Sequence, residues 1–209
     1  MIKAPKTITM DEIIASSFFD FHVKGFDYIC LKRTPSKTLK IYFFDGDVNA
    51  LPEVVAPHDH RYQFTTTVLC GDVGNTVYVP YTAENAYRGF HVFERFDYLT
   101  PLNGGNGFTW RATEPLTRLR TDYYGPGEMY GMEAAQIHTI RIWGPQTVLM
   151  LLQREDDVPV GVPTSTWCRD REPPSLDGLY RKPTPDEVRK RLGQLASWGH
   201  GALVPTVFE

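Results

Sequence analysis

The residues best suited to chemistry in this chain are two histidines that lie two positions apart, His58 and His60. In an extended segment alternate side chains share a face, so both imidazoles point the same way and Asp59 points the other way. Two imidazoles on one face can supply two neighbouring ligands to a divalent metal. A third histidine, His138, lies inside the later strand-like stretch 137–140. This spacing predicts a metal site built from two distant parts of the chain.

Several neighbouring side chains are candidates for acting on a bound substrate. Tyr62 shares the face of His60 if the extended segment continues, and Tyr130 precedes the third histidine. A bulge could turn Gln63 inward as a metal ligand or a hydrogen-bond donor, although an outward-facing position is the alternative. Glu128 could complete a mixed site of histidine and carboxylate, but a glutamate beside a Pro-Gly pair is more often a solvated turn residue. The candidate catalytic residues are therefore Tyr62, Gln63 and Tyr130.

Arginines on expected strands offer a second kind of contact with a substrate. The four are Arg111, Arg118, Arg120 and Arg141. An arginine that faces inward can hold a carboxylate through two parallel hydrogen bonds. Most strand arginines instead lie on the solvent face with their aliphatic stems on apolar surface. Arg120 and Arg141 are the candidates for substrate binding.

The elements that must position these residues are mostly β-strands. Apolar and aromatic runs alternate with Gly, Pro, Asn and Asp turns, and little helix separates them. This rhythm predicts an all-β fold, an antiparallel sandwich or barrel. The expected strands are 21–31, 38–44, 65–69, 75–79, 87–99, 108–123, 136–143 and 147–153.

Two helices are expected, one near each end of the chain. Thr9 and Glu12 form a capping box before an apolar run, which predicts a short N-terminal helix over one face or end of the sheet. Thr184 and Glu187 form a second capping box, with proline at the first helical position. We expect a helix over 185–198, packed outside the barrel or used in a dimer contact.

Length and composition limit the classes of protein that need to be considered. The 209 residues suit one domain, with a core at about 21–153 and an irregular extension at 154–209 that carries one helix. The net charge of -3 provides no basic field for nucleic acid or acidic membranes. No apolar run is long enough to span a membrane, and the N-terminus lacks the apolar core of a signal peptide. Three widely spaced cysteines form no disulfide framework, so a reduced cytoplasmic location is expected.

The histidine segments resemble those of the cupins, small antiparallel β-barrels that hold a metal with histidines. The first cupin motif reads G-x5-H-x-H-x3,4-E-x6-G, and His58, His60 and Gly71 match it. Pro52 stands where the first glycine would be, and Phe64 and Thr65 fill the two places open to the glutamate. The second motif, a P-x-G element followed by a histidine, is matched loosely by a Pro-Gly pair at 126–127 and by His138.

A histidine segment without this glutamate resembles that of one cupin group, the thiol dioxygenases related to cysteine dioxygenase. The resemblance covers about 54–153 and implies iron held by His58, His60 and His138 without a carboxylate. It does not extend to the substrate-binding apparatus. Where that family has a Ser-x-His-x-Tyr element, residues 148–152 are entirely apolar, and the family's crosslinking cysteine has no counterpart near Gln63. The metal site is therefore carried over, whereas cysteine as the substrate is not.

The expected function follows from a metal held by three neutral ligands. Such a metal keeps its full +2 charge and its open positions, so it would bind a small polar or anionic molecule directly, and dioxygen beside it. The resemblance favours Fe(II) and a mononuclear non-haem dioxygenase, and imidazole also suits Zn, Mn or Ni. A non-redox isomerase, lyase or hydrolase, a non-catalytic cupin that binds a small ligand, and a metal-free structural protein are the alternatives. The expected partners are the small substrate, dioxygen and a second copy in a homodimer.

Overall fold

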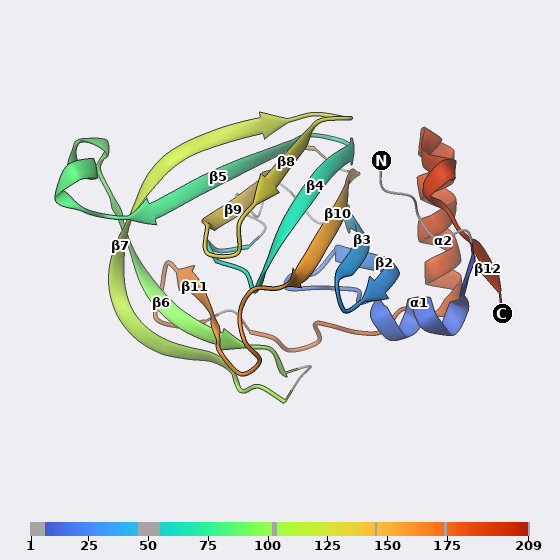
Figure 1. The fold of residues 1–209 in the computed structure, drawn as a ribbon, viewed down its shortest axis with the longest axis horizontal. Helices are drawn as coiled ribbons and strands as arrows, with labels where there is room; N and C mark the ends of the chain where they lie inside the picture. Colours follow the sequence, from blue (N-terminus) through green and yellow to red (C-terminus); the bar gives the residue numbers. More distant parts are fainter. Residues whose placement is uncertain (1–6, 46–54, 102–103, 145, 174, 209) are drawn as a thin grey trace.

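The computed structural model describes residues 7–45, 55–101, 104–144, 146–173 and 175–208. Two five-stranded sheets form a half-barrel, and two helices lie beside it at one end (Figure 1). The first sheet has the order β2-β3-β10-β4-β8, and the second has the order β11-β6-β7-β5-β9. All neighbouring strands within these two sheets are antiparallel. The predicted all-β antiparallel fold with a short helix near each end is therefore confirmed.

The bounds of the strands lie close to those expected from the sequence. The first sheet consists of β2 (Phe26–Thr34), β3 (Lys37–Phe44), β4 (Tyr62–Cys70), β8 (Met129–Met132) and β10 (Thr147–Asp156). The second consists of β5 (Val73–Pro80), β6 (His91–Leu99), β7 (Gly107–Tyr124), β9 (Ile137–Ile142) and β11 (Thr164–Cys168). A short parallel pair, β1 (Thr7–Thr9) with β12 (Thr206–Phe208), joins the two ends of the described chain.

Three strand expectations differ from the structure, each for a local reason. The strand expected from residue 21 begins only at Phe26, because Asp20 and His22 have positive φ angles of 52° and 69°, which extended strands exclude. Residues 87–90 are not part of a strand, because a 3-10 helix, η1 (Ala83–Arg88), precedes β6. The extension after residue 153 is not wholly irregular, since it contributes β11 to the second sheet.

Both helices begin at the capping boxes that the sequence predicts. Thr9 caps α1 (Met10–Ser16), and Thr184 caps α2 (Pro185–Leu195), in each case with reciprocal bonds to the glutamate three residues later. The chain then continues as a π-helical turn, η3 (Ala196–His200), and a 3-10 turn, η4 (Gly201–Leu203), so the regular α-helix ends three residues before the expected residue 198.

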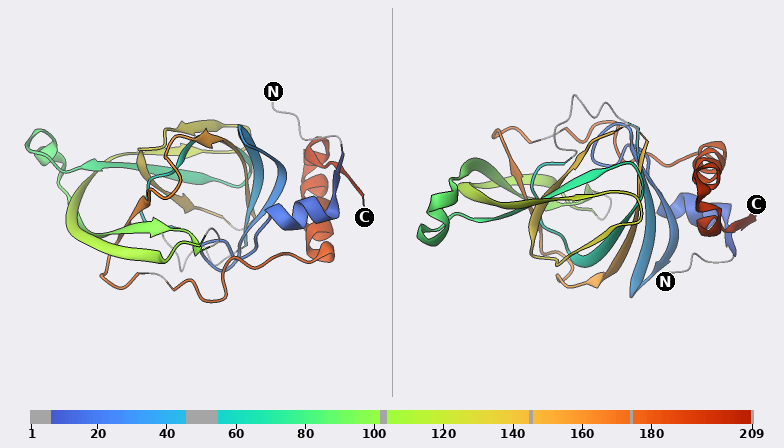
Figure 2. Two further views of the ribbon diagram at one scale, coloured as in Figure 1. Left: turned by 60° about the horizontal axis from the view of Figure 1, so that its bottom comes forward. Right: turned by 90° about the horizontal axis from the view of Figure 1, so that it is seen from above.

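The first sheet is buried on both faces, which explains why β3 reads as a nearly continuous apolar run. Its outer face packs against α1 and α2, as the two further views show (Figure 2). Its inner face packs against the second sheet and forms the interior of the half-barrel. The inner cluster includes Phe64, Val68, Val77, Ile142, Leu149 and Leu151. This interior is where the histidines lie.

Gly71 makes the tight connection between β4 and β5 that follows the histidine segment. Its φ angle is +73°, and a Cβ atom there would lie 2.3 Å from Oγ1 of Thr147 and 2.9 Å from that residue's Cα. Both the left-handed backbone and the crowding against β10 demand glycine. The glycine of the predicted histidine motif therefore serves the hairpin that carries β4 away from the candidate site.

In the described parts of the chain, no helix combines the length and the hydropathy needed to cross a bilayer. The expected turn at 45–49 lies almost wholly outside the described residues, as does the start of the segment that leads to the histidines. The homodimer and the cytoplasmic location stay predictions.

Candidate metal centre

The histidine segment is held in place by strands on both of its sides. The backbone N–H of His58 donates to the carbonyl of His138 at 2.9 Å, and the N–H of His138 donates back at 3.0 Å. On the other side, the N–H of Trp167 in β11 donates to the carbonyl of Pro57 at 2.8 Å. His58 therefore bridges β9 and β11, and its backbone pairing places it directly opposite His138.

Asp59 points away from the two imidazoles, as the alternation predicts. Its carboxylate accepts from the backbone N–H of Ser165 at 2.7 Å, and its own N–H donates to the Ser165 carbonyl at 3.1 Å. Burial raises the pKa of Asp59. Asp59 thus fastens the segment to β11 and leaves the opposite face to the histidines.

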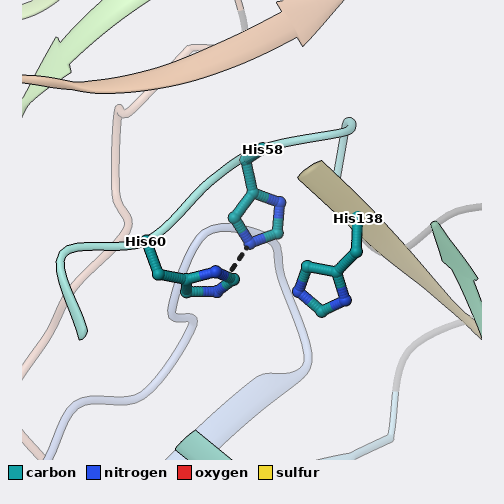
Figure 3. Close-up of side chains that lie close together, drawn as sticks. All are labelled: His58, His60 and His138. Atoms are coloured by element: carbon teal, nitrogen blue, oxygen red, sulfur yellow. Dashed lines mark hydrogen bonds between the residues drawn. The ribbon is translucent and has the colours of Figure 1, made fainter. Parts of the chain in front are cut away.

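The three predicted histidines converge in space (Figure 3). Nε2 of His58 lies 3.2 Å from Nε2 of His60. The ring centre of His138 lies 5.1 Å from that of His58 and 5.0 Å from that of His60. One nitrogen from each ring can be chosen so that all three lie within 4.8 Å of one another. Nitrogens bound at about 2.1 Å to one ion would be about 3.0–3.4 Å apart, so one pair already has this spacing and the third ring must move inward to join it.

Hydrogen bonds on the far side of two rings set which nitrogen faces the centre. Nδ1 of His58 lies 2.8 Å from the carbonyl of Ala56, and Nδ1 of His138 lies 2.6 Å from Oδ1 of Asn75. Since a carbonyl oxygen can only accept, the proton of each ring is on Nδ1, and Nε2 keeps its lone pair. Such outer partners fix the tautomer and the orientation of metal-binding histidines.

All three imidazoles are held in the neutral form that binds metals. Burial lowers the pKa of His58, despite the opposing effect of the hydrogen bond to Ala56. Burial also holds the pKa values of His60 and His138 well below the usual range, and the neighbouring histidines lower them further because charged rings would repel one another. No proton therefore needs to be displaced from Nε2 of His58 or His138 at neutral pH.

The donor set fits a divalent metal better than it fits a purely structural cluster. Nδ1 of His60 is buried and has no hydrogen-bond partner among the described residues. In addition, the 3.2 Å contact pairs two nitrogens that would both be ligand atoms. A metal bound at Nε2 of both rings would account for this close contact between two nitrogens, whereas Nδ1 of His60 would still lack a partner among the described residues. Three neutral imidazoles suit iron, zinc, manganese or nickel.

The other sequence candidates for catalysis lie near the histidines. Tyr62 is half-buried with its ring centre 5.7 Å from that of His60, and burial raises its pKa to about 12. Tyr130 is buried in the half-barrel interior, next to Phe64, and burial raises its pKa. Gln63 is half-buried beside a register shift in the pairing of β4 with β10. The catalytic role of Tyr62, Gln63 and Tyr130 stays a prediction.

The charged candidates are exposed. Arg120 pairs with Asp122 at 2.6 Å, and Arg141 lies over the ring of Trp143 with 4.3 Å between its guanidinium carbon and the ring centre. Glu128 is exposed and accepts from the N–H of Gly125 at 2.7 Å, which is the solvated turn position considered in the sequence. Substrate binding by Arg120 and Arg141 stays a prediction.

Sequence reasoning missed one charged residue in the interior, Lys40 on β3. It is 5% exposed, and its Nζ lies over the rings of Tyr28 and Tyr62, 5.1 Å and 5.6 Å from their centres. The signal in the sequence is a single lysine between Leu39 and Ile41, inside an otherwise apolar strand. Strand alternation alone could have placed it on the same face as Tyr42.

Comparisons with known proteins concern the fold. No family model matches the sequence, and no curated protein matches it. The chain is similar to KdgF from Halomonas sp., with 13% identity over 64% of this chain and 82% of that chain, and a TM-score of 0.36. It is similar to hydroxypropylphosphonic acid epoxidase from S. wedmorenis, with 14% identity over 73% of this chain and 59% of that chain, and a TM-score of 0.40. A cupin superfamily protein from Desulfitobacterium hafniense has 11% identity over 62% of this chain and 76% of that chain, and a TM-score of 0.34.

The chain folds as two antiparallel five-stranded sheets. Its two antiparallel sheets form the half-barrel, and the three histidines lie in the interior between them. The half-barrel places His58 on the segment between β9 and β11, His60 just before β4, and His138 on β9.

Proposed function

We propose that this chain is a metal-dependent enzyme, a mononuclear non-haem iron dioxygenase that acts on a small polar or anionic molecule. The observation that carries the proposal is the convergence of His58, His60 and His138, with Nε2 of two rings freed by acceptors at Nδ1. Nε2 of His58 and Nε2 of His60 are 3.2 Å apart, which is the spacing of two nitrogens bound to one ion.

The protein residues would divide the work between holding the metal and shaping its surroundings. His58, His60 and His138 would bind a divalent ion, which would supply Lewis acidity and, as Fe(II), the one-electron chemistry that dioxygen needs. The neutral imidazoles favour an anionic substrate atom beside them, because they cancel none of the positive charge. Phe64, whose ring centre lies 4.7 Å from that of His60, limits the access of water on one side.

A second candidate is a non-redox lyase, isomerase or hydrolase that uses zinc, manganese or nickel. It is favoured by the donor set, since three neutral nitrogens with open positions are also the arrangement of catalytic zinc. Tyr62, kept protonated by its raised pKa, could then donate a hydrogen bond to a substrate oxygen.

The test begins with metal content. The protein and its H58A, H60A and H138A variants are reconstituted without oxygen, with Fe(II), Zn(II), Mn(II) or Ni(II), and the bound metal is measured by elemental analysis. We expect about one ion per chain in the parent and a large loss in each variant, because each removes a ligand. An H91A variant is the matched control, because His91 is an exposed histidine on β6 outside the cluster.

Measurements of turnover then distinguish the dioxygenase from the non-redox enzyme. Oxygen uptake by the Fe(II) form is measured with panels of thiols, amino acids and carboxylates, and the same panels are tested anaerobically. Uptake that depends on both iron and substrate supports the dioxygenase, whereas turnover without oxygen supports the second candidate. Normal metal content in all three histidine variants would overturn both. Metal-dependent binding without any turnover would leave a ligand-binding protein.

A further inference from the structure

Lys40 lies on the inner face of the first sheet, among the residues that line the half-barrel. On β3 it pairs with Leu151 of β10 and with Cys30 of β2, and both belong to the interior cluster. Its neighbours Leu39 and Ile41 face the helices instead. The ammonium group is therefore carried into the same interior as the three histidines.

In the described part of the chain, no carboxylate forms an ion pair with this ammonium. Among the described residues, Lys40 has no ion pair and no hydrogen bond, and its contacts are the faces of Tyr28 and Tyr62. Asp156, whose charge raises the pKa of Lys40, is paired with Arg61 at 3.1 Å. Burial lowers the pKa of Lys40 to about 8, with Arg33 adding to the decrease and Cys30 and Asp156 opposing it. A nearly buried cation without a counter-ion is costly, and such groups are concentrated at functional sites.

Tyr62 connects Lys40 with the histidines. Its ring centre lies 5.6 Å from Nζ of Lys40 and 5.7 Å from the ring centre of His60. A molecule with a backbone of roughly four to six atoms extends about 4–6 Å, and a hydrogen bond to Nζ at one end and a bond to a metal at the other would lengthen its reach to about 9–11 Å. A metal bound by the histidines would then hold one end of such a molecule, and the ammonium of Lys40 would hold the other end.

We propose that Lys40 binds the remote carboxylate of a small dianionic substrate whose other end reaches the histidine centre. This inference rests on the proposed function and narrows its substrate class to short dicarboxylates and similar dianions. The aromatic faces of Tyr28 and Tyr62 hold the ammonium while it has no anion, because a cation is attracted to the face of an aromatic ring. The substrate would supply a counter-ion that the described residues do not provide.

The test compares succinate with succinamate, which has the same length but lacks the second charge. Binding of each is measured by titration calorimetry, in metal-free protein and in protein loaded with Zn(II), which does not react with oxygen. We expect the parent to bind succinate at least tenfold more tightly than succinamate. In K40M the preference is expected to disappear, and in K40R it is expected to return at least in part.

K182M is the matched control. Lys182 also lies over an aromatic ring, with its Nζ 3.5 Å from the centre of Phe18, but it donates to the carbonyls of Ala15 and Ser17. We expect K182M to keep the preference for succinate. Its melting temperature should fall, whereas that of K40M should rise by a few degrees, because methionine removes an uncompensated buried charge.

The outcomes separate this inference from the proposed function. Loss of the preference in K40M but not in K182M, with a raised melting temperature in K40M, supports the role of Lys40. An equal preference in K40M and the parent, or no preference in the parent, overturns it. If no metal binds but metal-free protein still shows a preference that depends on Lys40, the proposed function fails and the inference stands.

Discussion

At the scale of single residues, the outer partners of the histidine rings decide what the cluster can do. The carbonyl of Ala56 and the side chain of Asn75 hold the protons of His58 and His138 on Nδ1. Nε2 of each ring therefore has a lone pair that can bind a metal. Asn75 is itself 2% exposed, and its amide nitrogen lies 3.5 Å from the sulfur of Met132. The position of His138 therefore depends on a residue that binds no metal.

Replacing Asn75 with leucine should weaken metal binding without removing a ligand. We expect the affinity of the N75L variant for Zn(II) to fall by about 10- to 100-fold, because His138 loses the acceptor that orients its ring. Competition with a chromogenic chelator measures the change. T76V is the control, because Thr76 follows on the same strand and its hydroxyl pairs with Thr121 instead. An N75L affinity equal to that of T76V would show that the hydrogen bond to Asn75 has no such role.

The buried histidines should also make the metal-free protein sensitive to acid. In the unfolded chain a histidine binds a proton near its ordinary pKa of about 6.5, whereas the lowered pKa keeps the folded ring neutral. The unfolded state therefore binds more protons below that pH, and the free energy of unfolding falls as the pH decreases. The slope is about 1.4 kcal/mol per pH unit for each such ring.

Urea unfolding between pH 5 and pH 8 tests this expectation. H60Q removes one ring that stays neutral, so its stability should depend less steeply on pH than that of the parent. The slope should decrease by about 1.4 kcal/mol per pH unit below pH 6.5. Parallel curves for the two proteins would mean that His60 is protonated in the fold.

At the scale of elements, α2 is fixed to the first sheet by a buried ion pair. Arg191 and Asp27 are 7% and 6% exposed, and the guanidinium also lies 2.5 Å from a carboxylate oxygen of Asp45. The same guanidinium lies over the ring of Phe43, 5.0 Å from its centre. The helix thus covers the outer face of the strand that carries Lys40 on its inner face.

Removing the carboxylate of Asp27 should loosen this helix. We expect D27N to lower the free energy of unfolding by about 3 kcal/mol, because the charge of Arg191 is left without its buried partner. D186N is the matched control, since Asp186 pairs with Arg189 at the surface, where such a pair contributes about 0–1 kcal/mol. Urea unfolding measures both. Equal effects of the two substitutions would show that the buried pair does not anchor α2.

The sequence predicted elements that depend on contacts between residues close together in the chain, and it missed elements that depend on contacts between distant residues. Both capping boxes could be predicted because Thr9 and Thr184 bond to residues three positions away. The strand β11 was missed because, among the described residues, the regular strand with which it pairs is β6, far away in the chain, and its composition gave no local signal. The three histidines could be predicted from a motif and the face of Lys40 from strand alternation, whereas the pairing of β5 with β9 that brings Asn75 to His138 is seen only in the folded structure.

At the scale of the whole molecule, metal binding should be linked to stability. A ligand that binds only the folded state stabilises it by about 2.7 kcal/mol at a concentration 100 times its dissociation constant. For a chain of this size, the melting temperature should then rise by about 5–10 °C. Thermal unfolding with and without Zn(II) measures the shift, and a variant that lacks all three histidines should show none. An equal shift in that variant would indicate binding elsewhere.

The bridging position of His58 also bears on the order in which a growing chain can assemble. Residues 57–59 gain hydrogen-bonded neighbours on one side from β9 and on the other from residues 165–167. A nascent polypeptide that has not yet emerged beyond residue 163 contains all three histidines of the cluster but lacks β11, the strand against which His58 rests. Completion of the centre would therefore come late in synthesis, and a truncated form ending at residue 153 should retain the ligands yet lose their alignment.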